Sequence, residues 1–194
     1  MRSERIQRLA RDERSAAQAG FWWGLAEGLF FFIIPDVYIS FATLFALRAG
    51  AVAWLCSIAG SLVAIPIIYL LVVVLGVDYP GFLRALPAIS GTMIEQTGAR
   101  MASLGLPYTP FLAFGGVPLK VYAASAFSLG FSLGAVLVWT VFARIVRIAP
   151  TYVVAAAIRL LFGSRIDARP RFWLTGFALF WLVFYGFYFA RMQN

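Results

Sequence analysis

The hydrophobic positions of this chain are gathered into long, nearly uninterrupted runs. The clearest run covers residues 51–77 and contains no charged side chain. Two more runs follow at 131–163 and 172–190, the second rich in Phe, Trp and Tyr. Because about 20 consecutive apolar residues suffice for a helix to cross a bilayer, the pattern predicts an all-α integral membrane protein. We expect about three transmembrane helices, at about 51–77, 131–163 and 172–190.

Two further apolar runs, at about 21–47 and 108–130, are interrupted by polar residues and helix breakers. The first contains Glu27, Pro35 and Asp36. A proline removes a backbone donor, and carboxylates inside a bilayer need polar partners. We therefore expect a re-entrant hairpin with Pro35 at its tip.

The second interrupted run repeats this arrangement with a basic residue. Gly115, Gly116 and Pro118 break it, and Lys120 follows directly. The three breakers predict the tip of a second re-entrant hairpin. Interrupted apolar segments in both halves of a chain are typical of transporters built from inverted repeats, whose site lies where the broken segments meet.

The remaining segments are more polar and indicate the orientation of the chain. Residues 1–20 carry five arginines at a spacing of three and predict a basic surface helix on the cytoplasmic face: Arg2, Arg5, Arg8, Arg11 and Arg14. Residues 78–107 predict an extramembrane connector on the opposite face, with a short amphipathic helix near Met93 to Leu104. The domain organisation expected is therefore a basic segment at 1–20, a membrane domain at 21–163 and a C-terminal span at 172–190.

Composition narrows the chemistry that the chain can perform. It is 62% hydrophobic and 12% charged, with no histidine and one cysteine, Cys56. Disulfide frameworks, zinc sites and histidine-based catalysis are excluded by this inventory. We predict no catalytic residue, no metal and no cofactor, so we do not expect an enzyme. The net charge of +8 fits contact with anionic lipid rather than nucleic acid.

A second pair of charges lies deep in the run at 131–163. Arg144 and Arg147 are three positions apart, so a helix places them on one face. Arg144 lies about 20 Å along that helix, too deep for easy snorkelling to the interface. Guanidinium groups at this depth require acidic partners or phosphate.

Three of these motifs together resemble a known family. Residues 26–37, AEGLFFFIIPDV, resemble the FAESSFFPIPPDV-type signature of the small DedA proteins, the YqaA-like branch of the SNARE-associated (VTT-domain) family. Residues 111–124, FLAFGGVPLKVYAA, are similar to AGFTPIPYKVFTIAAG of that branch. Arg144 and Arg147 match the arginines of its GRGARF motif, although Ala143 and Ile145 replace the glycines.

The resemblance implies two opposed re-entrant hairpins in a bacterial inner membrane protein with a cytoplasmic N-terminus. It also implies a lipid translocase, a flippase or scramblase for a phosphate-bearing lipid such as a polyprenyl phosphate or phosphatidylethanolamine. Lys120, Arg144 and Arg147 would then bind the phosphate. Glu27 and Asp36 would pair with these cations and take up protons. The partners expected are membrane lipids and protons, and a homo-oligomer is left open.

Other interpretations of the same residues stay open. The fold could serve a proton-coupled ion or small-solute exchanger, or a non-transporting membrane-homeostasis scaffold. The charges could form a permanent structural ion-pair network. Asp36 could cap the second arm of its hairpin, and Lys120 could reach the membrane interface. The glycine pairs Gly24/Gly28 and Gly130/Gly134 have helix-packing spacing. We expect no chemistry from the run at 172–190.

Overall fold

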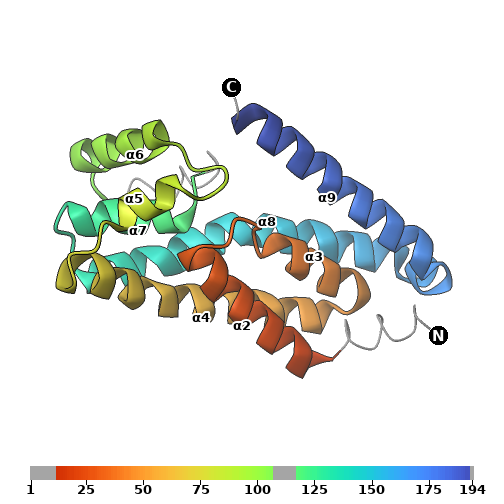
Figure 1. The fold of residues 1–194 in the computed structure, drawn as a ribbon. Coiled ribbons are helices and arrows are strands. Elements are labelled where there is room, and N and C mark those ends of the chain that lie inside the picture. The colour runs from red at the N-terminus through yellow and green to blue at the C-terminus, as the bar shows by residue number, and fades with distance from the viewer. Residues whose placement is uncertain (1–11, 107–116, 193–194) are drawn as a thin grey trace.

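The structure, a computed structural model, describes residues 12–106 and 117–192, and in these two ranges all regular secondary structure is helical (Figure 1). The elements in chain order are α2 (Glu13–Leu29), α3 (Asp36–Phe45), α4 (Leu47–Tyr69), a π-helical turn η1 (Leu70–Val74), α5 (Tyr79–Arg84), α6 (Gly91–Leu104), α7 (Leu119–Ser128), α8 (Leu133–Ala168) and α9 (Pro170–Met192).

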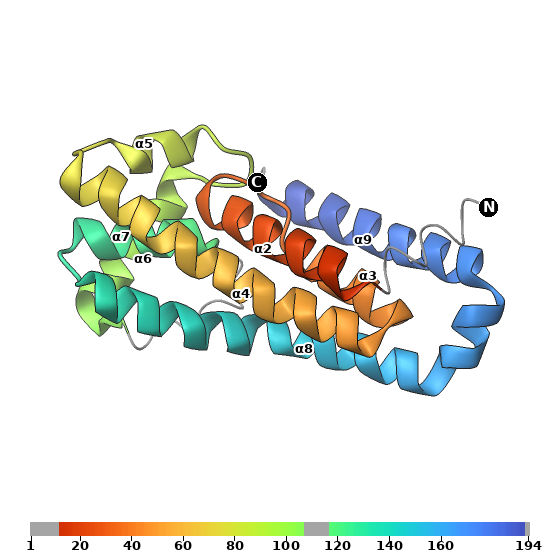
Figure 2. The same ribbon diagram turned by 90° about the horizontal axis from the view of Figure 1, so that it is seen from below.

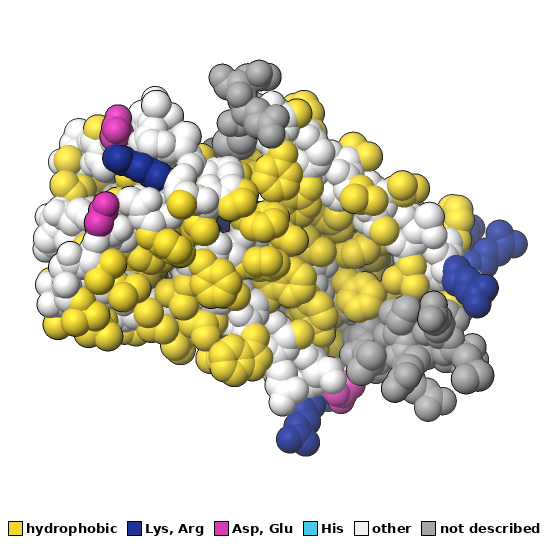
Figure 3. Space-filling view, viewed as in Figure 1, with side chains coloured by type: hydrophobic (Ala, Val, Ile, Leu, Met, Phe, Trp, Pro, Cys, Tyr) yellow, Lys and Arg dark blue, Asp and Glu magenta, His cyan; other side chains and the backbone are white. Residues whose placement is uncertain are grey.

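Three helices of the described chain are long and apolar enough to cross a membrane. They are the continuous helix of α4 and η1 at Leu47–Val74, α8 at Leu133–Ala168 and the Pro170–Ala190 part of α9. Each overlaps one of the runs that the hydropathy pattern singled out, so the prediction of an all-α membrane protein with three such helices is confirmed. Figure 3 shows one face of the molecule. Most of the charged side chains visible there lie toward its ends or edges, and hydrophobic side chains cover most of the area between them.

Helices α2 and α4 pack closely because glycines line their contact. A Cβ atom on Gly24 would collide with the carbonyl oxygen of Ser57, and one on Gly60 would collide with the carbonyl oxygen of Phe21. Gly28 is likewise closed off by the side chain of Ala64. The packing role expected for the Gly24/Gly28 pair is therefore confirmed.

The corresponding expectation for Gly130 and Gly134 is wrong. Within the described residues, no atom comes within 4 Å of a Cβ built on either glycine. Gly130 instead has a φ of +81° directly after α7, where its amide bonds the carbonyl of Phe127 and the Phe131 amide bonds that of Ala126. This positive φ ends a helix and is accessible to glycine at little cost, which accounts for Gly130.

The first interrupted run forms two helices joined by a short break. Helix α2 ends at Leu29, and α3 begins at Asp36 directly after Pro35, whose φ of −65° is that of a helix start. Helix α3 then lies between α4 and α8 (Figures 1 and 2). The run therefore places Glu27 near the end of one helix and Asp36 at the start of the next.

The second interrupted run is described from residue 117 onward. Gly115 and Gly116 lie outside the described residues, whereas Pro118 immediately precedes α7. Every residue of α7 from Leu119 to Phe127 is buried, which is unusual for a ten-residue helix that carries a lysine. Helix α6 at Gly91–Leu104 confirms the short helix expected near Met93 to Leu104.

Candidate functional site

An ion pair between α2 and α8 has both of its charged side chains buried. The Nη2 atom of Arg144 donates a hydrogen bond to Oε2 of Glu27. The two side chains are only 7% and 4% exposed. A buried charge without a partner would be very costly, so each residue makes the other tolerable at this depth.

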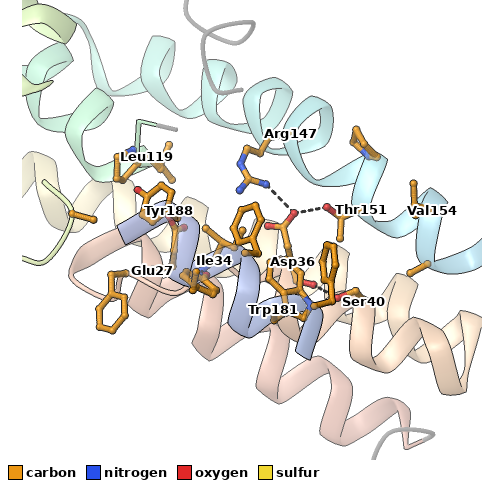
Figure 4. A pocket seen from close by; sticks show the side chains of 18 of the residues that line it. Glu27, Ile34, Asp36, Ser40, Leu119, Arg147, Thr151, Val154, Trp181 and Tyr188 are labelled. Carbon is orange, nitrogen blue, oxygen red and sulfur yellow. Dashed lines mark hydrogen bonds and ion pairs between the residues drawn. The ribbon is translucent and has the colours of Figure 1, made fainter. Parts of the chain in front are cut away.

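A second pair lies one turn further along α8 and is more open. Nη1 of Arg147 donates to Oδ1 of Asp36 at 2.8 Å, and the hydroxyl of Thr151 donates to the same oxygen at 2.6 Å (Figure 4). The Arg147 side chain is 25% exposed, whereas that of Asp36 is 2% exposed. Arg147 is therefore the more accessible of the two arginines. Thr151 was not singled out from the sequence, although it lies seven residues from Arg144 and so on the same helix face.

Two expectations about the hairpin residues are corrected here. Asp36 does not cap its helix, because no side chain caps the N-terminus of α3 and the described hydrogen bonds of Asp36 Oδ1 go to α8. Lys120 does not reach an interface, since it is 1% exposed. Both side chains are directed toward the interior by their partners on other helices.

Lys120 holds the C-terminal end of α2. Its ammonium donates to the backbone carbonyls of Glu27 at 2.9 Å and Phe31 at 3.0 Å. The hydroxyl of Tyr79, from α5, donates to the backbone carbonyl of Leu29 at 2.6 Å. A cation is favourable at a helix C-terminus, where unpaired carbonyls carry partial negative charge. Lys120 thus ties α7 to the break that separates Glu27 from Asp36.

These charges line one large cavity. Its volume is about 1200 Å³, and its lining includes all five: Glu27, Asp36, Lys120, Arg144 and Arg147. With every group ionised, three cations and two carboxylates leave one excess positive charge. Within residues 12–106 and 117–192, no group of three or more Cys, Asp or Glu side chains could hold a metal ion. The arrangement is suited to hold an anion.

Most of the cavity wall is apolar and extends along the membrane-crossing helices. On α8 the lining runs from Trp139 to Ile158, about 28 Å at about 1.5 Å per residue. This length is close to the thickness of a bilayer's hydrocarbon core, about 30 Å. The charged pairs lie within this length, between apolar residues on both sides.

The opposite wall is α9, the helix from which the sequence predicts no chemistry. Nine of its aromatic residues line the cavity: Phe172, Trp173, Phe177, Phe180, Trp181, Phe184, Tyr185, Phe187 and Tyr188. In addition, the hydroxyl of Tyr185 accepts a hydrogen bond from the backbone amide of Ile34 at 2.9 Å. The aromatic content of the run was visible in the sequence, but its proximity to the charges follows from the turn at Arg169, which brings α9 back beside α8 and α3 (Figure 2).

Two buried polar atoms of the ion pairs have no hydrogen-bond partner among the described residues, Asp36 Oδ2 and Arg144 Nε. Each belongs to a side chain that makes an ion pair with a residue of another helix. Unpaired buried polar groups are costly, and they occur more often at functional sites than in ordinary cores. The pairs thus retain hydrogen-bonding capacity that the fold does not use.

Comparison of the chain with protein-family models, curated proteins and solved structures gives no match. The fold and site by themselves define a class: an all-helical membrane protein with charged residues buried in a long apolar cavity. Any closer assignment depends on the chemistry of that cavity.

Proposed function

We propose that this protein is a lipid translocase, which moves a phosphate-bearing lipid between the leaflets of a membrane. The observation that carries the proposal is the cavity itself, which combines an excess positive charge with apolar walls of about bilayer length. A lipid has matching parts, an anionic headgroup and long apolar chains. A cavity that binds a water-soluble solute would need fewer apolar and aromatic side chains.

Arg147 is the residue that we propose contacts the phosphate first. Of its five N–H donors, one is used by Asp36, and its side chain is the most exposed of the buried ion pairs. The planar guanidinium group suits bidentate binding of phosphate. Arg144 and Lys120 lie along the same cavity and add positive charge beside the headgroup, while Asp36 and Glu27 hold the arginines when the cavity contains no anion.

The resemblance of the same residues to motifs of the small DedA proteins implies the same function. In that scheme the break between α2 and α3, with Pro35, is the tip of one re-entrant hairpin, and Gly115, Gly116 and Pro118 form the tip of the other. The two carboxylates are the candidates for proton coupling, because each faces an arginine that phosphate could engage instead. The membrane concerned would be a bacterial inner membrane.

Reconstituted liposomes test the proposal directly. Leaflet exchange of fluorescent phosphatidylethanolamine and of a polyprenyl phosphate would be measured for the wild type, for Arg147→Ala and for Arg171→Ala. Arg171 is the matched control, since it is exposed at the start of α9 and lies outside the cavity. We expect Arg147→Ala to slow exchange at least about tenfold, the effect of losing a charge-assisted hydrogen bond, and Arg171→Ala to leave it unchanged.

Repeating the assay at two pH gradients distinguishes the mechanisms. Exchange that follows the gradient would establish proton coupling, and exchange that ignores it would establish a scramblase. Folded wild-type protein that moves neither lipid would contradict the proposal. In that case an ion or solute exchanger would be tested next by flux into the same liposomes.

A further inference from the structure

The two halves of α9 are held to the rest of the protein in different ways. In the N-terminal half, Trp173, Leu174 and Phe177 pack against a buried cluster formed by Leu44, Phe45 and Ile166. The ring of Phe177 also contacts that of Phe41 at 5.9 Å between centroids. This half is therefore anchored by apolar contacts with α3 and α8.

The C-terminal half of α9 lies over the cavity. Phe180, Trp181, Phe184 and Tyr188 line the space instead of packing into a core cluster. In the same half, the hydroxyl of Tyr185 accepts a hydrogen bond from the backbone amide of Ile34, in the body of the protein.

Two contacts of this half with other described residues are made with the break between α2 and α3. Besides the Tyr185 hydrogen bond, the ring of Phe189 meets the edge of Phe32 at 5.8 Å between centroids. Ile34 lies two residues before Asp36, so these contacts are close in sequence to the partner of Arg147. A movement of this end of α9 would open the cavity beside the Asp36–Arg147 pair.

A hinge for such a movement exists where α8 meets α9. Arg169 joins the helices with φ −132° and ψ 59°, outside the helical range, and Pro170 begins α9. Hinges in proteins are typically a few residues at the ends of elements that absorb dihedral changes. The apolar anchor of the N-terminal half lies next to this junction, and the polar contact lies at the far end.

We propose that the C-terminal half of α9 is a lateral gate of the cavity and that the Tyr185–Ile34 hydrogen bond is its latch. This inference rests on the proposed function, because the gate admits the apolar chains of a lipid directly from the bilayer. The closed gate covers the cavity with the aromatic side chains of α9. Breaking the latch frees the far end of α9 while the anchor at Trp173, Leu174 and Phe177 remains.

Cysteine labelling tests the gate without any transported lipid. Ser40 lines the cavity and is 8% exposed, and Ser40→Cys in a Cys56→Ser background provides one thiol there. Its alkylation rate in liposomes would be compared between this parent, Tyr185→Phe and Tyr38→Phe. Tyr38 is the matched control, because it lies outside the cavity and its hydroxyl makes no hydrogen bond in the described part of the chain.

Loss of one hydrogen bond should raise the open population about two- to tenfold. We therefore expect Tyr185→Phe to speed labelling of the cysteine by that factor and Tyr38→Phe to leave the rate unchanged. Equal rates in Tyr185→Phe and the parent would overturn the gate. So would equal acceleration by both tyrosine substitutions.

A reversible cross-link provides a second test that keeps Tyr185 intact. Phe32→Cys and Phe189→Cys, combined with Cys56→Ser, would be bridged by a reducible bifunctional thiol reagent that spans the space of the two rings, to join the far end of α9 to the break. We expect lipid exchange to fall at least tenfold in the cross-linked protein and to recover on reduction. Full exchange by completely cross-linked protein would overturn the gate. Absence of exchange in the wild type would contradict the proposed function, and the labelling experiment alone would then decide whether the gate exists.

Discussion

The two ion pairs differ in the depth at which each is buried. Glu27 and Arg144 are both almost wholly buried, while Arg147 keeps a quarter of its side chain exposed. Because water screens an exposed charge, the inner pair depends on its partner for stability much more than the outer pair does. The outer pair is correspondingly the one that can exchange partners at low cost.

The inner pair should therefore dominate stability. Glu27→Gln leaves Arg144 buried without a counter-charge, and removal of one partner of such a pair costs roughly 3–5 kcal/mol. We expect a large drop in thermal stability in detergent for Glu27→Gln and a smaller one for Asp36→Asn. The double variant Glu27→Gln/Arg144→Gln should recover part of the loss, and a double variant less stable than Glu27→Gln would contradict this account.

Lys120 should act as a structural cap as well as a charge. Lys120→Met keeps the length of the side chain but leaves the carbonyls of Glu27 and Phe31 without their donor. Hydrogen bonds to charged groups contribute about 1.5–3 kcal/mol, so we expect a loss of this size in the free energy of unfolding. Arg100→Met, at an exposed position of α6, is the control and should have little effect.

At the scale of elements, the contact between α2 and α4 decides where Glu27 lies. Small residues allow the two backbones to approach so closely that Ser61 donates to the carbonyl of Gly24. Glu27 is one turn beyond Gly24 and is thereby directed toward α8. The packing of α2 against α4 therefore also determines the position of the buried carboxylate.

A methyl group at this contact should be poorly tolerated. The Cβ of Gly24→Ala would meet backbone atoms of Ser57, which cannot move aside cheaply, and overpacking of this kind costs about 1–3 kcal/mol. Gly98→Ala in α6 is the matched control, because nothing lies within 4 Å of its Cβ among the described residues. The control should be neutral or slightly stabilising, since alanine favours helix. Similar stabilities for both variants in thermal unfolding would refute the packing role.

The start of α2 should respond to acid. Asp12 caps this helix by accepting from the amide and hydroxyl of Ser15, and these hydrogen bonds hold the pKa of Asp12 below its ordinary value of 3.8. Because the pKa is lowered, the cap contributes its full stabilisation of the folded state above pH 3.8. This stabilisation is lost as the pH falls through the lowered pKa. Amide-exchange protection in the first turn should therefore decrease in acid. Asp12→Asn, which caps without ionising, should not show this decrease.

At the scale of the whole molecule, α9 is separable from the rest. In its apolar window no residue is buried, compared with 39% of the corresponding window of the first span. The helix thus completes the cavity without forming much of the core.

A chain that ends after Arg169 should accordingly remain folded. We expect it to keep its helical circular dichroism per residue and to melt within a few degrees of the full chain in detergent. It should lose the aromatic wall of the cavity and hence the retention of co-purifying lipid. Unfolding or aggregation of the truncated protein would show that α9 is part of the core.

Much of this architecture was predictable because bilayers impose strict lengths. The three long apolar helices, the break before Asp36 and the helix at Gly91–Leu104 all follow from hydropathy, proline and amphipathic patterns. The buried charges were evident as candidates because charge inside an apolar run is expensive. Thr151 and Tyr185 were missed, since a single hydroxyl in a membrane helix is common and carries no pattern of its own.

The sequence by itself determined the class of the protein, the approximate spans and the set of ionisable groups that need partners. Only the tertiary structure decided which carboxylate meets which arginine, that Lys120 bonds backbone carbonyls and that α9 covers the cavity. The physical reason is that apolar length and charge burial are local properties, whereas pairing depends on how close two helices approach. That distance is set by the shapes of the contacting residues. For example, Gly24 has no side chain where it meets the backbone of Ser57.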